Sequence, residues 1–336
     1  MDPRAMTPEL ARWTADQLGT LGYRTDFRPK PLLVEASHRL FYRVYVRSAE
    51  TPRTTFVVMS SPPDKELNEQ FVTLAAVFAN HGVGVPEVIA QARDAGYFLL
   101  SDLGARHFAD VYGSEEQDAA LAAGIDTLTH IQAVVDPQIP AYQAQRFRDE
   151  LHIFHEWFVE GWLADNFPSA DLDGVFEALV TNTQDQQQCC VHRDFHCRNL
   201  LFAENHAVGV VDFQDALIGP VSYDLASLLR DCYHRFAEPE IARWRDHYLQ
   251  RTPFDLDPQA FAVHLDLTAV QRQLKAVGIF ARLQLRDGKS SHLQHIPPVL
   301  AHLQDLADRY PELAPLRPHL TRWRSSFRSA RRDGAG

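Results

Sequence analysis

The sequence lacks the features that would place it in a membrane or on a nucleic acid. Its 336 residues contain no apolar run near the roughly 18 residues that a membrane-spanning helix requires. The first ten residues are mostly polar and contain proline, so no signal peptide is expected. The formal net charge of −11 disfavours binding to nucleic-acid phosphates, which depends on a basic surface. We therefore expect a cytoplasmic protein with small-molecule partners and, because no heptad repeat is present, a monomer.

Cysteine is scarce as well, with four residues in the chain. Three of them, Cys189, Cys190 and Cys197, lie near His192 and His196 in the sequence, so a metal cage is one interpretation of this segment. The C-x-x-C spacing of structural zinc sites is absent, however, and disulfides are rare in a reducing cytosol. We expect these cysteines to be small, buried, apolar residues.

The most informative pattern that is present runs over residues 192–202, His-Arg-Asp-Phe-His-Cys-Arg-Asn-Leu-Leu-Phe, and is followed by the apolar segment 207–211 and Asp212. Phosphoryl transfer from a nucleotide needs one carboxylate that accepts the proton of the attacking hydroxyl. It also needs an amide and a second carboxylate that hold magnesium. The spacing H-x-D-x-x-x-x-N before a strand that ends in D-F is a kinase signature. We predict that Asp194 is the catalytic base, that Asn199 and Asp212 bind Mg²⁺, and that ATP is the phosphoryl donor.

Each of these residues also has a purely structural interpretation. Asp194 could cap a turn, and Asp212 could be a turn residue at the end of a strand. His192 is expected to brace the loop, and His196 either packs within the loop or contacts phosphate or the acceptor. The ordered set of three oxygen ligands favours catalysis over these alternatives.

For the first third of the chain, the sequence predicts a sheet with helices. Thr7 is a predicted N-cap followed by Pro8, and residues 39–47 and 53–59 have the composition of the two strands of a hairpin. Further elements are predicted from periodicity and composition. They are a helix over 66–81, strands near 88–89 and 97–100, helices over 147–164, 226–236, 258–283 and 297–307, and a frayed tail over 322–336.

The expected nucleotide site lacks two usual parts. Segment 35–39, where a kinase usually has a glycine-rich loop, contains no glycine, and strand 56–59 contains no lysine to reach the phosphates. Ser37 and nearby backbone amides are predicted to hold the phosphates instead. The missing positive charge is expected from Arg39, Arg43 or Lys65, of which we favour Arg43, although each could be a solvated surface cation.

These motifs resemble the aminoglycoside phosphotransferase and choline kinase-like family. Segment 219–226, Gly-Pro-Val-Ser-Tyr-Asp-Leu-Ala, resembles the family motif whose aspartate, here Asp224, braces the catalytic loop. Segment 98–104 resembles the adenine-contacting hinge, in which backbone groups near Leu100 and Asp102 would bind the base.

The resemblance implies an α+β, two-lobed, protein-kinase-like fold. Residues 1–103 would form a small β-rich N-lobe with the nucleotide-binding sheet and a helix. Residues 104–336 would form a larger helical C-lobe with the catalytic loop, the metal site and the substrate-binding helices.

More specific segments resemble the bacterial anomeric amino-sugar kinases of cell-wall recycling. These segments are residues 35–44, 59–63, 212–216 and 271–283. Kinases of that subgroup phosphorylate the C1 hydroxyl of N-acetylmuramate and N-acetylglucosamine, and the resemblance implies the same ATP-dependent reaction here. The missing lysine is expected in this subgroup. The chain departs from the subgroup pattern at Glu35, which replaces an aspartate, and at His38, which replaces an aromatic residue.

A sugar acceptor requires buried polar groups that pair with its hydroxyls. The predicted substrate-binding residues follow the predicted metal-binding strand or lie on the next helix. They are Gln214, Asp215, Arg230 and Asp231. Glu150 and His155 are weaker candidates. A lactyl carboxylate would favour a nearby cation. Arg272 with Lys275, or Arg282 with Arg286, could supply one, unless these cations are solvated or paired with local acids.

Two alternatives remain open at this point. The acceptor could be another small alcohol, such as an aminoglycoside or a choline-like amine. The chain could also be a non-catalytic nucleotide-binding pseudokinase, as the missing lysine and glycines would suggest.

Overall fold

The computed structural model describes residues 5–32, 38–47, 55–168, 172–203 and 205–333. The chain forms two compact units. Unit 1 comprises residues 1–123 and 198–215, and unit 2 comprises residues 124–197 and 216–336. The predicted lobe boundary after residue 103 stays a prediction.

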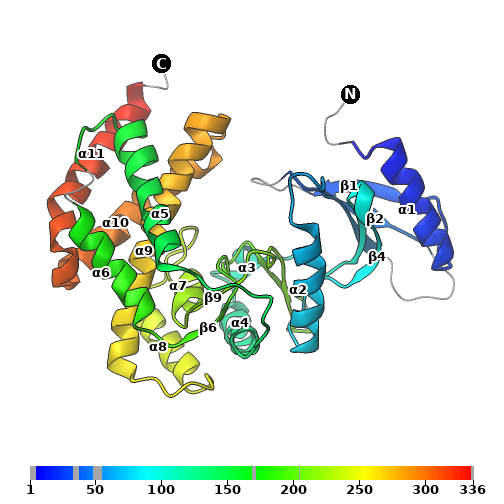
Figure 1. The fold of residues 1–336 in the computed structure, drawn as a ribbon, viewed down its shortest axis with the longest axis horizontal. Coiled ribbons are helices and arrows are strands. Elements are labelled where there is room, and N and C mark those ends of the chain that lie inside the picture. Colours follow the sequence, from blue (N-terminus) through cyan, green and yellow to red (C-terminus); the bar gives the residue numbers. More distant parts are fainter. Residues whose placement is uncertain (1–4, 33–37, 48–54, 169–171, 204, 334–336) are drawn as a thin grey trace. The chain divides into compact units, whose positions relative to one another are not determined.

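Unit 1 contains a five-stranded antiparallel sheet with the strand order β1-β2-β3-β5-β4 (Figure 1). The strands are β1 (Arg28–Leu32), β2 (Leu40–Tyr45), β3 (Thr55–Ser60), β4 (Val88–Ala92) and β5 (Tyr97–Ser101). The predicted hairpin is confirmed, because β2 pairs with β3 from Leu40 opposite Ser60 to Tyr45 opposite Thr55. Strand β1 lies at the sheet edge, where its two prolines remove no ladder hydrogen bond that the sheet needs.

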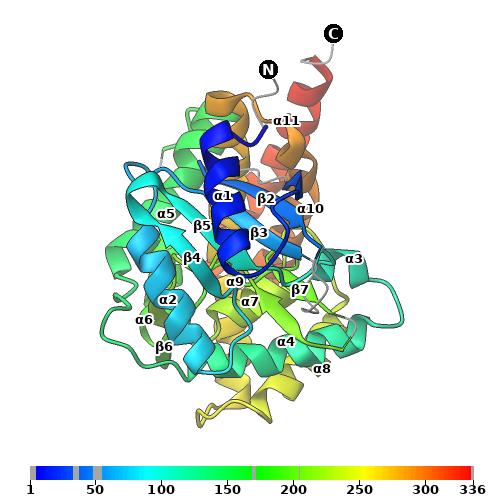
Figure 2. The same ribbon diagram turned by 90° about the vertical axis from the view of Figure 1, so that its right-hand side faces the viewer.

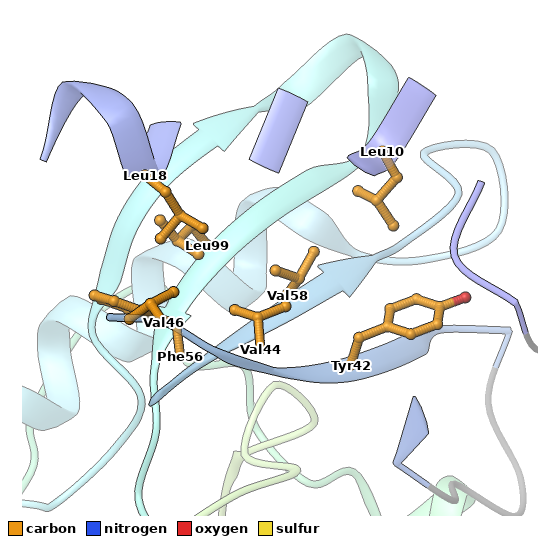
Figure 3. Close-up of a cluster of buried hydrophobic side chains, with 8 residues drawn as sticks. All are labelled: Leu10, Leu18, Tyr42, Val44, Val46, Phe56, Val58 and Leu99. Atoms are coloured by element: carbon orange, nitrogen blue, oxygen red, sulfur yellow. The ribbon is translucent and has the colours of Figure 1, made fainter. Parts of the chain in front are cut away.

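Two helices cover this sheet, one on each face. Helix α1 (Pro8–Thr20) begins at the predicted N-cap, whose hydroxyl accepts a hydrogen bond from the Leu10 amide at 3.3 Å. Helix α2 (Asn68–Asn80) packs on the opposite face through Phe71, whose ring centroid lies 6.1 Å from that of Phe98. Figure 3 shows the core under α1. It consists of Leu10, Leu18, Tyr42, Val44, Val46, Phe56, Val58 and Leu99.

A second hairpin in unit 1 carries the predicted metal ligands. It consists of β7 (Leu200–Phe202) and β8 (Val208–Val210), and the unit also contains the short helices η1 (Arg93–Ala95) and α3 (Phe108–Val111). The Val210 amide donates to the Gly84 carbonyl at 2.7 Å. A Cβ atom on Gly84 would lie 2.4 Å from the Val208 carbonyl oxygen, so only glycine permits this close approach.

Unit 2 is mostly helical and contains one two-stranded sheet (Figures 1 and 2). Helix α4 (Gln117–Gln132) runs from unit 1 into unit 2. The other helices are α5 (Ala144–Ile153), η2 (Phe154–Trp162), α6 (Asp173–Gln184), α7 (Tyr223–Leu229), α8 (Glu238–Leu249), α9 (Pro258–Asp287), η4 (Ser291–His295), α10 (Ile296–Arg309), η5 (Pro311–Leu316) and α11 (Arg317–Asp333). The strands are β6 (Gln188–Val191) and β9 (Leu217–Pro220), which pair antiparallel.

The helix predicted over 147–164 is present in two parts, because α5 continues into the π-helical segment η2. Its predicted apolar stripe is confirmed, since Leu151, Phe154 and Phe158 are fully buried. The helices predicted at 258–283 and 297–307 are confirmed as α9 and α10.

Two predictions about unit 2 are wrong. The helix predicted over 226–236 ends at Leu229, and the segment up to Phe236 is not helical. The tail predicted to fray is helix α11 over most of its length. Trp323 and Phe327 on this helix are buried, and Trp323 packs edge-on against Phe154 with a centroid distance of 5.3 Å. Long-range burial therefore stabilises a segment whose local composition is strongly basic.

The cysteine prediction is confirmed for the three residues near the catalytic motif, because Cys189, Cys190 and Cys197 are all buried. Among the residues that the structure describes, no helix is both long enough and apolar enough to cross a membrane.

Candidate active site

The predicted catalytic loop follows β6 in unit 2. His192 is fully buried, and its Nδ1 accepts a hydrogen bond from the Asp194 amide at 3.2 Å. Asp224, on α7, accepts hydrogen bonds from the amides of His192 at 2.6 Å and Arg193 at 2.9 Å. Arg193 has a φ of 78°, a left-handed conformation that a side chain of this size rarely adopts. The carboxylate of Asp224 thus holds the strained loop through the two amides that precede the predicted base.

Burial dominates the electrostatics of Asp224. Removal from water raises its pKa to about 7, against the lowering effect of the two amide hydrogen bonds and of Arg272. The opposite balance holds at Asp194, whose side chain is 42% exposed. Partial burial raises its pKa, but the positive charges of Lys275 and Arg272 outweigh this effect, and the pKa lies below its usual range. Asp194 is therefore ionised near neutral pH, as the predicted role of proton acceptor requires.

Two cations near Asp194, Arg193 and Lys275, pair with a buried carboxylate on α5. Glu150 contacts Arg193 Nη2 at 2.8 Å and Lys275 Nζ at 2.9 Å through Oε1. Its Oε2 accepts hydrogen bonds from the Tyr142 hydroxyl at 2.5 Å and from Gln271 Nε2 at 3.3 Å. Burial raises the pKa of Glu150. The positive charges of Lys275 and Arg193 lower this pKa by more, so the carboxylate is ionised.

Arg272 links α9 directly to the loop. Its Nη2 lies 3.9 Å from Asp194 Oδ1 and donates to Ser227 Oγ at 2.7 Å. Its Nη1 donates to the carbonyl of Arg193, and its guanidinium lies 4.5 Å above the ring of Tyr223. The cation predicted for a substrate carboxylate is thus also part of the loop's support.

The predicted metal ligands lie together in unit 1. Asn199 Nδ2 is 3.4 Å from Asp212 Oδ2, and the Val211 amide donates to the Asn199 carbonyl at 3.1 Å. Asp212 has a φ of 65°, and Gln214 Nε2 donates to its Oδ1 at 2.9 Å. Its exposed carboxylate and the Asn199 amide oxygen are the hard donors that Mg²⁺ prefers. The strained conformation at this position is typical of functional sites.

The aromatic residue after Asp212 fixes this hairpin to α2. Phe213 is fully buried and stacks on Phe71 with a centroid distance of 5.1 Å. The rings of Phe78 and Phe213 also meet edge-on at 5.8 Å. Rigid packing next to the predicted metal-binding carboxylate limits its movement.

The structure brings two of the predicted nucleotide-binding residues together. Arg43 on β2 and Asp102 after β5 form a bidentate ion pair, with Nε–Oδ2 and Nη2–Oδ1 distances of 2.7 and 3.0 Å. Arg43 also donates to the Gly104 carbonyl at 2.5 Å. The pair therefore holds the hinge segment to the sheet. Leu100 lies buried on β5, where its neighbour in β3 is Val57.

A second arginine lies at the start of β2. Arg39 is 5% exposed, and its Nε is 3.2 Å from Ser61 Oγ and 3.4 Å from Glu66 Oε2. Its guanidinium lies 5.4 Å from the centre of the Phe71 ring. Lys65 is exposed, and Ser37 lies outside the described residues.

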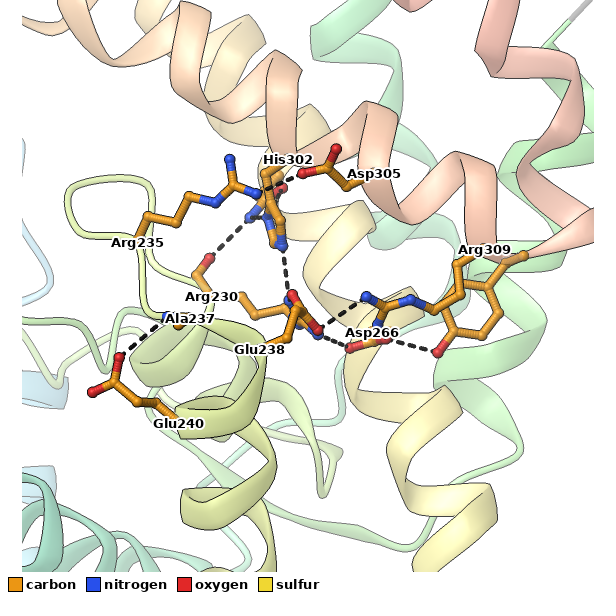
Figure 4. A network of polar contacts seen from close by, with 11 residues as sticks. Arg230, Arg235, Ala237, Glu238, Glu240, Asp266, His302, Asp305 and Arg309 are labelled. Carbon is orange, nitrogen blue, oxygen red and sulfur yellow. Dashed lines mark hydrogen bonds and ion pairs between the residues drawn. The ribbon is translucent and has the colours of Figure 1, made fainter.

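The predicted sugar-binding residues are divided between the two units. Gln214 is half-buried and Asp215 exposed, both in unit 1. Arg230, in unit 2, is 2.5 Å from Asp266, 2.8 Å from Glu238 and 2.8 Å from His302 Nε2 (Figure 4). Buried within this network, its guanidinium links α7 to α8, α9 and α10.

Asp231 is also occupied. Its Oδ2 accepts from the Cys197 amide at 3.2 Å and its Oδ1 from the Tyr233 amide at 3.0 Å. Of the weaker candidates, Glu150 holds cations, and His155 Nε2 contacts the Phe167 carbonyl at 2.7 Å. Sequence reasoning missed the linking roles of Glu150 and Asp231, because the partners of each come from other elements.

Comparisons with known proteins agree with the motif. A model of the phosphotransferase enzyme family, APH, matches residues 33–262. The N-acetylmuramate/N-acetylglucosamine kinase of Pseudomonas putida is 33% identical over 319 residues, covering 92% of this chain and 94% of that protein. The kinase of the same name from Pseudomonas aeruginosa is 35% identical over 297 residues, covering 86% and 87%.

Solved structures include a similar fold. The ADP-bound crystal structure of aminoglycoside phosphotransferase APH(2″)-Ib has a TM-score of 0.57 and 14% identity, covering 88% of this chain and 98% of that one. This likeness confirms the predicted α+β, protein-kinase-like fold class.

Proposed function

Since the chain belongs to the phosphotransferase enzyme family, we propose that it transfers the γ-phosphoryl group of ATP to the C1 hydroxyl of N-acetylmuramate or N-acetylglucosamine. The observation that carries this proposal is the similarity to two kinases named for these sugars, at 33% and 35% identity over most of the chain. The retained base and metal ligands support turnover rather than nucleotide binding alone.

In this proposal Asp194 orients the C1 hydroxyl and accepts its proton as the phosphoryl group is transferred. Its pKa, lowered by Lys275 and Arg272 against the effect of burial, keeps it ionised for this role. Asp224 and His192 hold the loop in its strained conformation. The protein's contribution is positioning and electrostatics, because phosphoryl transfer needs little covalent chemistry from the enzyme.

The donor set of Asn199 and Asp212 fits magnesium. Mg²⁺ usually takes one or two protein oxygens and completes its octahedral shell with phosphate oxygens and water. Within the described residues, no group of three or more His, Cys, Asp or Glu side chains is placed to hold a metal ion. Bound magnesium would neutralise charge on the phosphates of ATP.

The remaining parts of the nucleotide site are proposed on similar grounds. Backbone groups near Leu100 and Asp102 would bind the base, and Arg39 or Arg43 would supply positive charge toward the phosphates. The ion pair between Arg43 and Asp102 supports a role of Arg43 in shaping the hinge. The enzyme would act in the cytoplasm as a monomer in peptidoglycan recycling.

The experiment that tests this function measures ADP release with ATP and magnesium across a panel of acceptors. The panel contains N-acetylmuramate, N-acetylglucosamine, glucose, choline and kanamycin, and phosphorus NMR locates the new phosphate. We expect an anomeric phosphate on one or both amino sugars. Turnover only on kanamycin or choline would refute the sugar assignment. No turnover with nucleotide still bound would favour a pseudokinase.

A further inference from the structure

Aromatic and imidazole side chains gather beside the catalytic loop in unit 2. The ring of Tyr233 meets the rings of His196 and His295 edge-on, at centroid distances of 5.3 and 5.0 Å. Phe280 and His292 are stacked on each other at 5.1 Å, and Phe280 lies 6.2 Å from Tyr233. We call these five residues the ring cluster. They come from the catalytic loop, the segment after α7, α9 and η4.

Hydrogen bonds hold the segments that carry His196 and Tyr233 next to Asp194. The carboxylate of Asp231 accepts hydrogen bonds from the amides of Cys197 at 3.2 Å and Tyr233 at 3.0 Å, so one side chain joins both segments. The His196 amide donates to the Asp194 carbonyl at 2.9 Å. The position of the rings is therefore set relative to the residue that would receive the proton of the acceptor.

Exposure divides the ring cluster into a support and a surface. Phe280 and His292 are buried, whereas His196, Tyr233 and His295 are half-buried. Three of the five side chains are thus partly exposed to solvent, above a support of two buried rings. A partly exposed surface on a buried aromatic support is the construction of a small-molecule binding site.

The chemistry of this surface suits a sugar. A pyranose ring has apolar C–H faces and a rim of hydroxyl groups. Tyr and His present a flat apolar body for such a face, at little cost in side-chain entropy.

We propose that the ring cluster is the platform on which the pyranose ring of an N-acetylated amino sugar rests, with Tyr233 as the main specificity-determining contact. This inference rests on the proposed function and adds to it the residues that recognise the acceptor. The platform holds the sugar so that its reacting hydroxyl meets Asp194, and it contributes mainly to acceptor affinity.

The test compares kinetic constants for N-acetylglucosamine in matched variants of the full chain. We expect Tyr233→Ala to raise the KM for N-acetylglucosamine about tenfold or more, the effect of losing roughly 1.4 kcal/mol of binding. The Kd for ADP with magnesium should stay within about twofold of wild type, because the platform contacts only the acceptor. Tyr233→Phe should keep a wild-type KM, since the ring face carries the contact.

The neighbouring His234→Ala variant is the control. The ring of His234 packs against Phe236 at 4.4 Å and lies outside the ring cluster. A KM for Tyr233→Ala within about twofold of wild type would overturn the platform, as would an equal loss in Tyr233→Phe. If Tyr233→Ala fails to fold, His295→Ala decides in the same assay, with a raised KM expected and an unchanged KM refuting the inference. A wild-type enzyme that phosphorylates no sugar would overturn the proposed function together with the platform.

Discussion

The roles proposed for Asp194 and Asp212 can be separated by experiment at the scale of single residues. Asp194→Ala should lower kcat by about 10²–10⁴, the usual contribution of a positioned general base, and leave the Kd for ATP with magnesium nearly unchanged. Asp212→Ala should instead weaken nucleotide binding only when magnesium is present. Calorimetric titration with and without the metal, beside steady-state kinetics, separates the two effects. Turnover of Asp194→Ala within about tenfold of wild type would reject its role as base.

Glu150 is the residue on which two cations near the base depend. Its carboxylate is 6% exposed and pairs with Arg193 and Lys275. Glu150→Gln keeps the shape of the side chain but removes the negative charge that pairs with both cations, and breaking a buried pair costs about 3–5 kcal/mol. We expect the free energy of unfolding, measured with urea, to fall by roughly 3 kcal/mol. We also expect kcat to fall by a larger factor than the Kd for ATP changes.

The same substitution at a surface ion pair provides the control. Glu177, whose side chain is 56% exposed, pairs with Arg148 at 2.6 Å. Glu177→Gln should cost less than about 1 kcal/mol and leave kcat unchanged. Equal losses of stability in the two variants would contradict the role given to Glu150.

At the scale of elements, α9 sets the position of the cations around the base, and Gly278 sets the position of α9. A Cβ atom there would lie 2.5 Å from the carbonyl oxygen of Ile153, at the junction of α5 and η2. Gly278→Ala gains about 1 kcal/mol in helix propensity but forces backbone apart, which typically costs about 1–3 kcal/mol or more. We expect a net loss of stability and, because Arg272 and Lys275 move with α9, a lower kcat.

Gly174 on α6 is the matched control for this prediction. Nothing lies within 4 Å of a Cβ atom built on it. Gly174→Ala should be neutral or raise the melting temperature, and its kcat should equal that of wild type. A Gly278→Ala variant with the stability and kcat of wild type would contradict this prediction, because it would show that α9 tolerates a side chain at this contact.

Over the whole molecule, the sequence predicted what local pattern encodes. The catalytic motif, the N-cap at Thr7, the β2–β3 hairpin and helix α9 follow from spacing, capping chemistry and periodicity. Strand β1 was missed because its prolines argue against a strand, although an edge position tolerates them. The role of each predicted site residue stays a prediction until variants are measured.

What could not be predicted depends on contacts between distant segments. Arg43 and Asp102 are 59 residues apart in the chain, yet they form a bidentate pair. The periodicity after α7 predicted a longer helix. The side chain of Arg230 instead forms hydrogen bonds and ion pairs with partners on three other helices (Figure 4). Tertiary ion pairs and hydrogen bonds of this kind override local propensity.

The same network predicts how stability depends on pH. His302 is 7% exposed, and its Nε2 must accept from Arg230 Nη1, because an arginine cannot accept. Burial, followed by Arg230 and Arg235, lowers the pKa of His302 to about 3, so the folded protein keeps the ring neutral. The unfolded chain binds a proton below about pH 6.5, so the stabilisation is complete above that pH and is lost as the pH falls toward 3. At pH 5 the loss is about 2 kcal/mol.

Asp224 acts in the opposite direction, because its raised pKa of about 7 means that the folded protein binds a proton before the unfolded chain does. The prediction therefore concerns a difference in which Asp224 cancels. His302→Gln keeps an acceptor for Arg230 but does not titrate, so its free energy of unfolding should fall less than that of wild type between pH 8 and pH 5, by about 2 kcal/mol. Urea unfolding at both pH values measures this, with the exposed His130→Gln as control. Parallel pH profiles for wild type and His302→Gln would show that the buried ring is protonated in the native network.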